Sequence, residues 1–255
     1  MLNKFCIVIP VYNDSAWITQ CLESVCNQDY QNYKVVVVDD HSTDGTWDII
    51  KSYNIPCWRN GERNGSGLAN IVKGIKYCSD NKDDIIVTVD GDDWLADCSV
   101  LTYLSTIYTE DVWLTYGSFI PVSRSYQGTC QPLFSTHTFN DSGEHLYSKL
   151  TSNTYRQSGV WVTSHLRTFR RFLWDQINDA DLRDQSGEYF KTAWDMAFMY
   201  PMIEMAGDER IRFIDKILYY YNDLNPANDG KVDPALQIAT GKYIQSKPCY
   251  QLWNR

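Results

Sequence analysis

The sequence predicts a single α/β domain over residues 1–255, with a mainly parallel, twisted sheet flanked by helices. Short apolar runs rich in β-branched residues alternate with segments of helical spacing over roughly the first 115 residues. Continuous apolar strands are typical of a parallel sheet that helices cover on both faces. No internal repeat, low-complexity tract or linker divides the sequence.

The elements of the first half follow in order from these two patterns. Strands are predicted at residues 5–11, 35–38, 55–58, 85–89 and 112–116. Helices are predicted at residues 17–25, 46–53, 68–77 and 100–107. Because strands and helices alternate, we expect the strands to run parallel, with helical crossovers between them.

The second half is expected to be more irregular. Residues 117–160 are rich in Ser, Thr, Gly and Tyr, which favours loops and irregular strands. Helical spacing predicts helices at residues 165–177, 193–206 and 234–245. Two short apolar runs predict a hairpin or edge strands, at residues 211–214 and 217–221.

Polar side chains follow three of the predicted strands at the point where each strand ends. They are Tyr12-Asn13-Asp14 after the first strand, Asp39-Asp40 after the second, and Asp90 to Asp93 after the strand over 85–89. In doubly wound sheets, ligands bind outside the carboxyl ends of the strands. The sequence therefore predicts a ligand site along this edge of the sheet.

The segment Asp90-Gly91-Asp92-Asp93-Trp94 is the candidate cation site. Its carboxylates offer hard oxygen ligands, which suit Mg²⁺ or Mn²⁺ bridging to a diphosphate. A cation there would neutralise a diphosphate leaving group. The alternative is an Asp- and Gly-rich turn that caps the following helix, because both residue types favour turns.

The segment after the second strand offers another polar contact. Asp40 is placed to accept hydrogen bonds from a ribose or a base, whereas Asp44 suits the N-cap of the next helix. Turn chemistry alone is the alternative for this segment.

Charge and missing motifs exclude several function classes. The net charge is −9, so a nucleic-acid partner, which requires a basic face, is not expected. The first strand-to-helix turn, residues 10–15, contains no glycine, which excludes the dinucleotide-binding fingerprint, and no phosphate-binding P-loop is present. The basic cluster Arg167, Arg170 and Arg171 indicates either a site for one small anionic ligand or a solvated helix face.

Cysteine usage and the N-terminal sequence bear on location. The 8 cysteines are scattered without a CxxC pair, and the N-terminal apolar run is short and contains Pro10. No apolar stretch approaches the ~20 residues of a membrane span. We therefore expect a cytoplasmic protein, with peripheral membrane contact and oligomeric state left open.

Four segments now occur in an informative order along the first half. They are Pro10-Val11-Tyr12-Asn13, Val38 to Thr46, Asn64 to Asn70, and Asp90 to Leu95. This series resembles the family 2 glycosyltransferases of GT-A fold over roughly residues 3–115. The resemblance implies a UDP-sugar donor and a divalent cation, Mn²⁺ or Mg²⁺. It also implies that residues 1–115 bind the nucleotide-sugar, and that residues 116–255 bind the acceptor and carry the catalytic base.

By this resemblance, specific positions acquire expected roles in donor binding. Asp90 would face the ribose or donor sugar, and Asp92 would hold the metal. The full expected donor-binding set is Pro10, Val11, Tyr12, Asn13, Asp40, Asn64, Asp90 and Gly91.

The general base is expected at Asp195. Most family members carry a Glu-Asp pair at a helix start, but here Trp194 occupies the position of the first acid. An inverting transfer needs one carboxylate to take the proton of the acceptor hydroxyl as it attacks C1. A simple N-terminal helix charge is the alternative role for Asp195.

Four further residues are candidates for the site. His165 could approach the metal or diphosphate, although a structural histidine is the alternative, and Arg167 could pair with the diphosphate. Trp94 and Trp194 are the aromatic residues expected near the site, because sugars stack on rings.

The sequence therefore predicts a metal-assisted transfer of a hexose from a UDP-sugar to an acceptor hydroxyl, and the family resemblance implies inversion. The acceptor could be a glycan, a lipid-linked sugar or a protein hydroxyl. A nucleotidyltransferase acting on sugar phosphates is the alternative enzyme, although its usual basic loop after the first strand is missing. A non-catalytic nucleotide-sugar-binding module is the alternative from another class.

Overall fold

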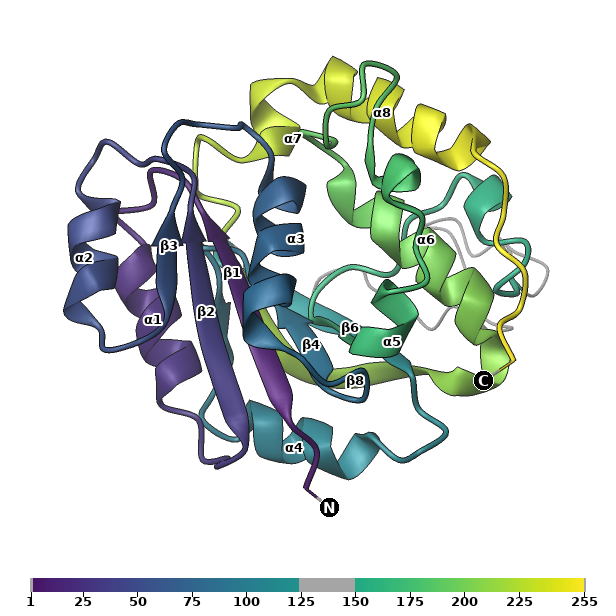
Figure 1. The fold of residues 1–255 in the computed structure, drawn as a ribbon, viewed down its shortest axis with the longest axis horizontal. Helices are drawn as coiled ribbons and strands as arrows, with labels where there is room; N and C mark the ends of the chain where they lie inside the picture. The colour runs from purple at the N-terminus through teal and green to yellow at the C-terminus, as the bar shows by residue number, and fades with distance from the viewer. Residues whose placement is uncertain (1, 124–149, 255) are drawn as a thin grey trace.

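The computed structural model describes residues 2–123 and 150–254, which form one eight-stranded sheet with helices on both faces (Figure 1). The strands are β1 (Phe5–Val11), β2 (Tyr33–Asp39), β3 (Cys57–Arg59), β4 (Ile85–Thr88), β5 (Trp94–Leu95), β6 (Leu114–Pro121), β7 (Arg167–Arg170) and β8 (Ile211–Tyr221). Their spatial order is β3-β2-β1-β4-β7-β6-β8-β5. The prediction of an α/β fold flanked by helices is confirmed.

Eight α-helices connect and cover these strands within the described ranges. They are α1 (Ile18–Cys26), α2 (Thr46–Ser52), α3 (Gly67–Cys78), α4 (Val100–Ile107), α5 (Arg171–Trp174), α6 (Trp194–Ala206), α7 (Asp229–Val232) and α8 (Pro234–Ser246). The predicted helices of the first half all form within two residues of their expected bounds. In the second half, α6 and α8 match the helices predicted over 193–206 and 234–245.

The first half of the chain supplies the parallel part of the sheet. β1 lies between β2 and β4, and β3 pairs with β2, all in parallel. Every residue of β1 is buried, as expected for a strand covered on both faces. The carboxyl ends of these strands therefore meet at one edge, which lies at the top in Figure 1 beside α7 and α8.

The second half adds antiparallel pairing. β7 runs antiparallel to both β4 and β6, β8 runs parallel to β6, and β5 runs antiparallel to β8 at the edge. Most of the loop-rich stretch expected over residues 117–160 lies outside the described residues.

The basic amphipathic helix predicted over residues 165–177 is wrong. Residues 167–170 form the strand β7 between β4 and β6, and only the short helix α5 follows it. All four β7 residues are buried, and the guanidinium of Arg170 donates to the carbonyls of Val112, Asp83 and Thr109. Charges that usually mark a solvated helix face are here satisfied by partners inside the fold.

The strands predicted at residues 211–214 and 217–221 are confirmed, but a hairpin between them is wrong. Ile211–Tyr221 is one continuous strand that pairs with β6 on one side and β5 on the other. The pairing with β6 shifts register between Gly117 and Phe119, so a single long strand accommodates both apolar runs.

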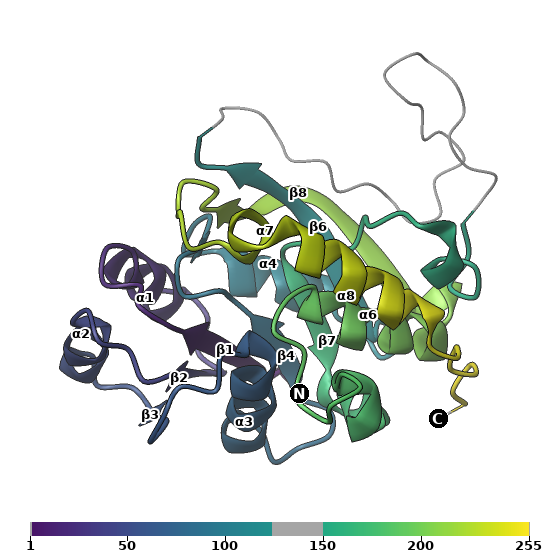
Figure 2. The ribbon, with the colours of Figure 1, turned by 90° about the horizontal axis from the view of Figure 1, so that it is seen from above.

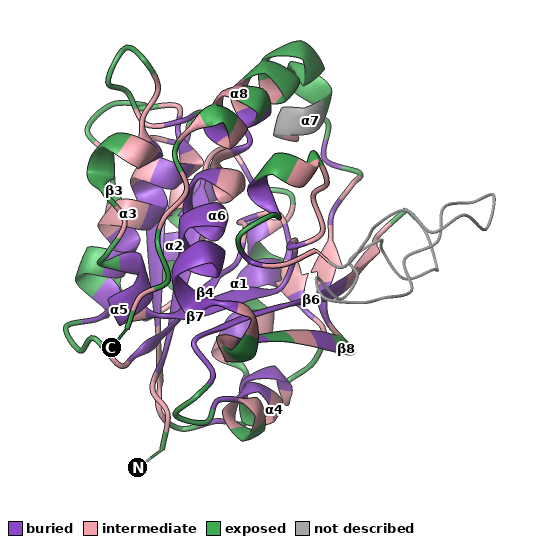
Figure 3. Cartoon of the chain, turned by 90° about the vertical axis from the view of Figure 1, so that its right-hand side faces the viewer, coloured by how far each residue is buried: buried purple, intermediate pink, exposed green. Residues whose placement is uncertain are grey.

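Apolar side chains fill both faces of the sheet. α1, α2 and α4 contribute to one buried cluster, whereas α3, α5 and α6 contribute to the other. Seen from above in Figure 2, α1 and α4 lie on one side of β1 and α3 on the other. Figure 3 shows α6 as a buried helix beneath the largely exposed α8.

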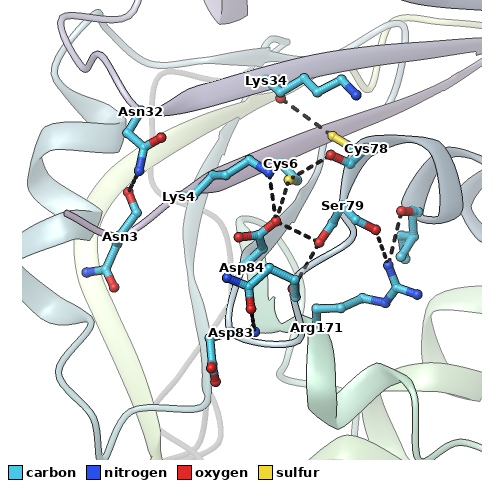
Figure 4. Close-up of polar contacts among 12 residues, drawn as sticks. Asn3, Lys4, Cys6, Asn32, Lys34, Cys78, Ser79, Asp83, Asp84 and Arg171 are labelled. Carbon is cyan, nitrogen blue, oxygen red and sulfur yellow. Dashed lines mark hydrogen bonds and ion pairs between the residues drawn. The ribbon is translucent and has the colours of Figure 1, made fainter. Parts of the chain in front are cut away.

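A compact polar cluster closes the amino ends of the central strands (Figure 4). The buried carboxylate of Asp84 pairs with the ammonium of Lys4 at 2.9 Å and accepts a hydrogen bond from the Ser79 hydroxyl at 2.8 Å. The guanidinium of Arg171 donates to the Ser79 carbonyl at 2.6 Å. This cluster joins β1, β4 and the end of α3 at the edge of the sheet opposite the polar strand ends.

Among residues 2–123 and 150–254, no helix has both the length and the apolar character that crossing a bilayer requires. The seven described cysteines are free thiols, and Cys130 lies outside the described residues.

Candidate active site

A cavity of about 400 Å³ opens at the carboxyl ends of the parallel strands. Its walls come from three parts of the chain: the segments that follow β1, β2 and β4, the loop before α3, and the second half from His165 onward. The sequence-predicted residues that line it are Pro10, Val11, Tyr12, Asp40, Asp90, Gly91, Asp92, His165, Arg167, Trp194 and Asp195. The structure thus brings residues from both halves of the chain into one cavity.

Three predicted residues are not among those that line this cavity. The Asn13 carboxamide accepts a hydrogen bond from the Thr43 amide, which ties the loop after β1 to the loop after β2. The Asn64 carboxamide accepts one from the Ser66 amide, which stabilises the local turn before α3. Trp94 stacks on Tyr220 in the edge pair of β5 and β8, with ring centroids 6.0 Å apart. Their predicted contacts with donor remain predictions.

Asp40 organises the loop that precedes α3 on one side of the cavity. One carboxylate oxygen accepts from the Asn60 carboxamide at 2.8 Å and from the Asn64 amide at 3.0 Å. The other accepts from the Gly65 amide at 2.8 Å. Asp40 therefore holds the loop before α3 against the end of β2, and it is only 3% exposed.

Sequence reasoning missed two cationic residues of the cavity, Arg63 and Lys191. The Arg63 guanidinium lies 3.8 Å from the centroid of the Tyr12 ring, which is a cation–π contact. The available signal was weak: Arg63 directly precedes Asn64-Gly65-Ser66-Gly67, but nothing in the sequence connects this loop with Tyr12.

The turn Asp90 to Asp93 is held from both sides. Behind it, a Cβ on Gly91 would lie 2.8 Å from the Asp14 carboxylate and 3.0 Å from Val11, so a side chain there would collide with the end of β1. The Asp93 carboxylate accepts from the Tyr219 hydroxyl at 2.7 Å and from the Asn222 amide at 2.6 Å. This contact explains why Asp93 is fully buried.

Asp92 faces the cavity and has a different partner. Its carboxylate accepts from the Asn225 carboxamide at 2.8 Å, and both residues line the cavity. The three hydrogen bonds from Tyr219, Asn222 and Asn225 fix the Asp90–Asp93 turn to β8 and the segment after it.

Several carboxylates crowd this end of the sheet. Burial, followed by repulsion from Asp92, raises the pKa of Asp14 well above its usual value. Burial and repulsion from Asp92 and Asp90 likewise raise the pKa of Asp93. Burial also raises the pKa of Asp92, although the hydrogen bond from Asn225 opposes that shift. Such crowding of like charges is characteristic of sites that bind a cation.

The donor set suits a divalent cation. Ligand atoms of Asp90, Asp93 and His165 lie within 4.8 Å of one another. Burial and the nearby Arg167 lower the pKa of His165 well below its usual value, which favours the neutral imidazole that can bind a metal. Since Asp93 is fully buried and held by Tyr219 and Asn222, the cavity-lining Asp92 is better placed to reach a cation in the cavity.

Arg167 joins the two acidic sides of the cavity. Its buried guanidinium pairs with Asp195 at 2.9 Å and lies 3.7 Å from Asp90. Burial opposes the charge, but attraction to Asp195 and Asp90 outweighs it and raises the pKa of Arg167. The guanidinium of Arg167 therefore stays charged between Asp90 and Asp195.

Asp195 lies in the first turn of α6 and lines the cavity. Besides its pair with Arg167, it accepts a hydrogen bond from the Met196 amide at 3.0 Å. Trp194 precedes it, with its ring 5.6 Å from the Arg167 guanidinium. A Cβ on Gly67 would lie 3.3 Å from the Trp194 ring, so this indole packs directly against the start of α3.

The mixed sheet, with its acid-lined cavity at the carboxyl ends of parallel strands, is a GT-A fold. The sequence matches the model of Glycosyl transferase family 2 over residues 6–177, and the chain belongs to that family. The family favours glycosyl transfer over the nucleotidyltransferase alternative.

Known proteins agree with this placement. The chain is 26% identical over 224 residues to the glycosyltransferase GlyA of Streptococcus pneumoniae, covering 86% of this chain but only 30% of GlyA. It resembles residues 1–349 of Staphylococcus aureus TarS solved with UDP-GlcNAc, with a TM-score of 0.62 and 22% identity, covering 86% of this chain and 58% of that one. It also resembles the mannosyltransferase PcManGT of Pyrobaculum calidifontis, solved with GDP-Man and Mn²⁺, with a TM-score of 0.60 and 15% identity, covering 98% and 66% of the two chains.

Proposed function

We propose that this protein transfers a hexose from a UDP-sugar to an acceptor hydroxyl, with a divalent cation at Asp92 and with Asp195 as general base. The observation that carries this proposal is that one cavity contains both acidic groups, one at the end of β4 and the other at the start of α6. The proposed donor and acceptor groups therefore face the same space.

The nucleotide would lie against the end of β1. The stacked Tyr12 and Arg63 side chains offer a flat surface for the base, and Asp40 positions the loop beside it. UDP is favoured as the donor nucleotide because the motif series resembles UDP-sugar enzymes, and the TarS structure contains UDP-GlcNAc. The GDP-Man bound to PcManGT makes GDP the nucleotide to test against it.

Asp92 would hold the cation, with Asp90 and His165 beside it. When bound, Mn²⁺ or Mg²⁺ would supply positive charge to the departing diphosphate. Arg167, held between Asp90 and Asp195, contributes a fixed positive charge on the same side.

Asp195 would accept the proton of the acceptor hydroxyl as that hydroxyl attacks C1 of the donor sugar. The hydrogen bonds from Arg167 and Met196 orient the carboxylate, yet its oxygens retain lone pairs for the incoming proton. Attack from the side opposite the leaving nucleotide gives inversion at C1.

Thermal shift with nucleotides and cations tests donor binding directly. We expect UDP with Mn²⁺ to raise the melting temperature more than UDP with EDTA, and more than GDP with Mn²⁺, because only a ligand of the folded state stabilises it. Stronger stabilisation by GDP, or no dependence on the cation, would contradict the donor and metal assignments respectively.

Turnover separates an enzyme from a binding module. We expect Mn²⁺-dependent release of UDP from at least one UDP-hexose, measured by coupled detection of free UDP. Tight binding of UDP-sugars without any UDP release, with or without acceptor mixtures, would instead favour the non-catalytic module.

A further inference from the structure

A second cavity, of about 490 Å³, lies beside the candidate active site. It is formed by the segment from Asp184 to Thr192 on one side and by α8 on the other. Lys191 lines both cavities, so the two spaces are neighbours across one short piece of chain.

The wall between the two cavities is fixed to the lining of the first cavity. The carbonyl of Phe190 accepts a hydrogen bond from the Ser66 hydroxyl at 2.7 Å, and Ser66 lines the first cavity. The chain then continues through Lys191 and Thr192 to Asp195. Three residues of extended chain span at most about 11 Å, so Thr192 lies close to the proposed base.

The lining of the second cavity has the composition of a carbohydrate site. The half-buried ring of Tyr243 offers an aromatic surface for the C–H face of a sugar. The buried Phe190 ring supports it edge to face, with centroids 6.0 Å apart. Polar side chains surround these rings, including Gln185, Ser186 and Thr240. An apolar surface with a few well-placed polar groups is typical of small-ligand sites.

One polar group of this cavity is unsatisfied in the part of the chain that the structure describes. Thr192 is only 5% exposed, and its buried hydroxyl has no hydrogen-bond partner among the described residues. A buried hydroxyl without a partner is costly, which indicates that a bound molecule or a rearranged side chain completes it.

We propose that the second cavity binds the acceptor, and that the acceptor is an oligosaccharide. Its reactive sugar would lie at Asp195, and its next sugar units would lie between Asp184–Thr192 and α8. This inference rests on the proposed function, because it assumes that Asp195 marks the place of transfer. It specifies a glycan of at least two units in place of a single sugar or a protein hydroxyl.

An array of synthetic and bacterial oligosaccharides tests this proposal, with UDP and Mn²⁺ present throughout. Wild-type protein is compared with Ala239→Trp, which fills the cavity, and with Ile238→Trp, the same change at an exposed neighbouring position that does not line it. Tyr243→Leu provides a second disruption that removes the ring but keeps apolar volume.

We expect wild type and Ile238→Trp to bind the same oligosaccharides, and Ala239→Trp and Tyr243→Leu to bind them about tenfold more weakly or worse. Stabilisation by UDP and Mn²⁺ should be the same in all four proteins. Glycan binding that Ala239→Trp and Tyr243→Leu leave unchanged, binding only of alkyl glycosides, or no glycan binding at all would overturn the proposal.

The failure of this inference can be distinguished from failure of the proposed function. If UDP and Mn²⁺ do not stabilise the wild-type protein, the donor site itself is wrongly assigned. If they do, and the glycan results fail as described, only the acceptor assignment is overturned.

Discussion

Buried carboxylates at the two ends of the central strands have different surroundings. At the amino ends, Asp84 has a cation, Lys4, and a hydroxyl donor, Ser79, so its charge is satisfied by the protein alone. At the carboxyl ends, burial raises the pKa values of Asp14, Asp92 and Asp93, and repulsion from Asp92 raises those of Asp14 and Asp93 further. The first arrangement pairs a carboxylate with a cation, whereas the second places several carboxylates side by side, which suits the cation binding proposed above.

Removing a carboxylate from the crowded end should give the largest effect on activity. For Asp92→Ala we expect sugar transfer and UDP release to fall about a thousandfold, because the cation loses its main ligand. The free energy of unfolding without metal should not fall, since a repelled charge is removed. Urea unfolding and UDP-release assays measure the two effects, and near-normal turnover would place the metal elsewhere.

Replacing the proposed base Asp195 should slow sugar transfer without weakening the binding of UDP. Asp195→Asn is expected to lower transfer about a hundredfold or more, because the acceptor hydroxyl then lacks a proton acceptor. The affinity for UDP and Mn²⁺ should be retained, because the amide still fits beside Arg167. Single-turnover kinetics together with calorimetric titration of UDP check this outcome, and loss of UDP binding would instead indicate a role in the donor site.

At the amino ends of the strands, removing the Asp84 carboxylate should lower stability and leave activity unchanged. Asp84→Ala removes the partner of Lys4 and Ser79 and is expected to lower the free energy of unfolding by about 2 kcal/mol. Activity per folded molecule should not change, because no contact of Asp84 reaches the cavity. Urea unfolding and UDP release are compared with those of Asp84→Asn, which should recover part of the lost stability.

The smallest expected effect is that of removing the hydrogen-bond donor of Asp92. Asn225→Ala removes the hydrogen bond to Asp92 without removing a carboxylate, so we expect the Mn²⁺ concentration for half-maximal activity to rise about tenfold. Maximal activity at saturating Mn²⁺ should be nearly normal. Metal titrations monitored by both activity and Mn²⁺ electron paramagnetic resonance test this, and an unchanged metal affinity would reduce Asn225 to a structural residue.

The sequence predicted the parallel strands and the polar residues at their ends, but not the side-chain contacts among these residues. Apolar runs located the parallel strands, and Tyr12, Asp40 and Asp90, which follow these strands, line the cavity at that edge. The strand β7 was missed because its arginines resemble a solvated helix face, whereas their partners lie elsewhere in the chain. Contacts such as Tyr12 with Arg63, or Arg167 with Asp195, depend on tertiary packing, which local spacing does not encode.

The roles of the neighbouring acids illustrate the same limit. In the sequence, the assignment of the metal to Asp92 is only what the family resemblance implies, and nothing there gives Asp93 a separate role. The structure supplies a physical difference: Asp93 is fully buried against Tyr219 and Asn222, whereas Asp92 borders the cavity. No periodicity in the sequence distinguishes two adjacent carboxylates.

The hydrogen bonds from β8 to the acidic turn have a consequence for how the protein matures during synthesis. Asp93 and its partner Tyr219 are separated by 126 positions, and Asp92 and Asn225 by 133. The ribosome therefore makes the acidic turn long before the residues that hold its carboxylates in place. A nascent chain that has emerged only as far as β6 already contains the acidic turn. It lacks the hydrogen bonds that Tyr219, Asn222 and Asn225 later donate to that turn.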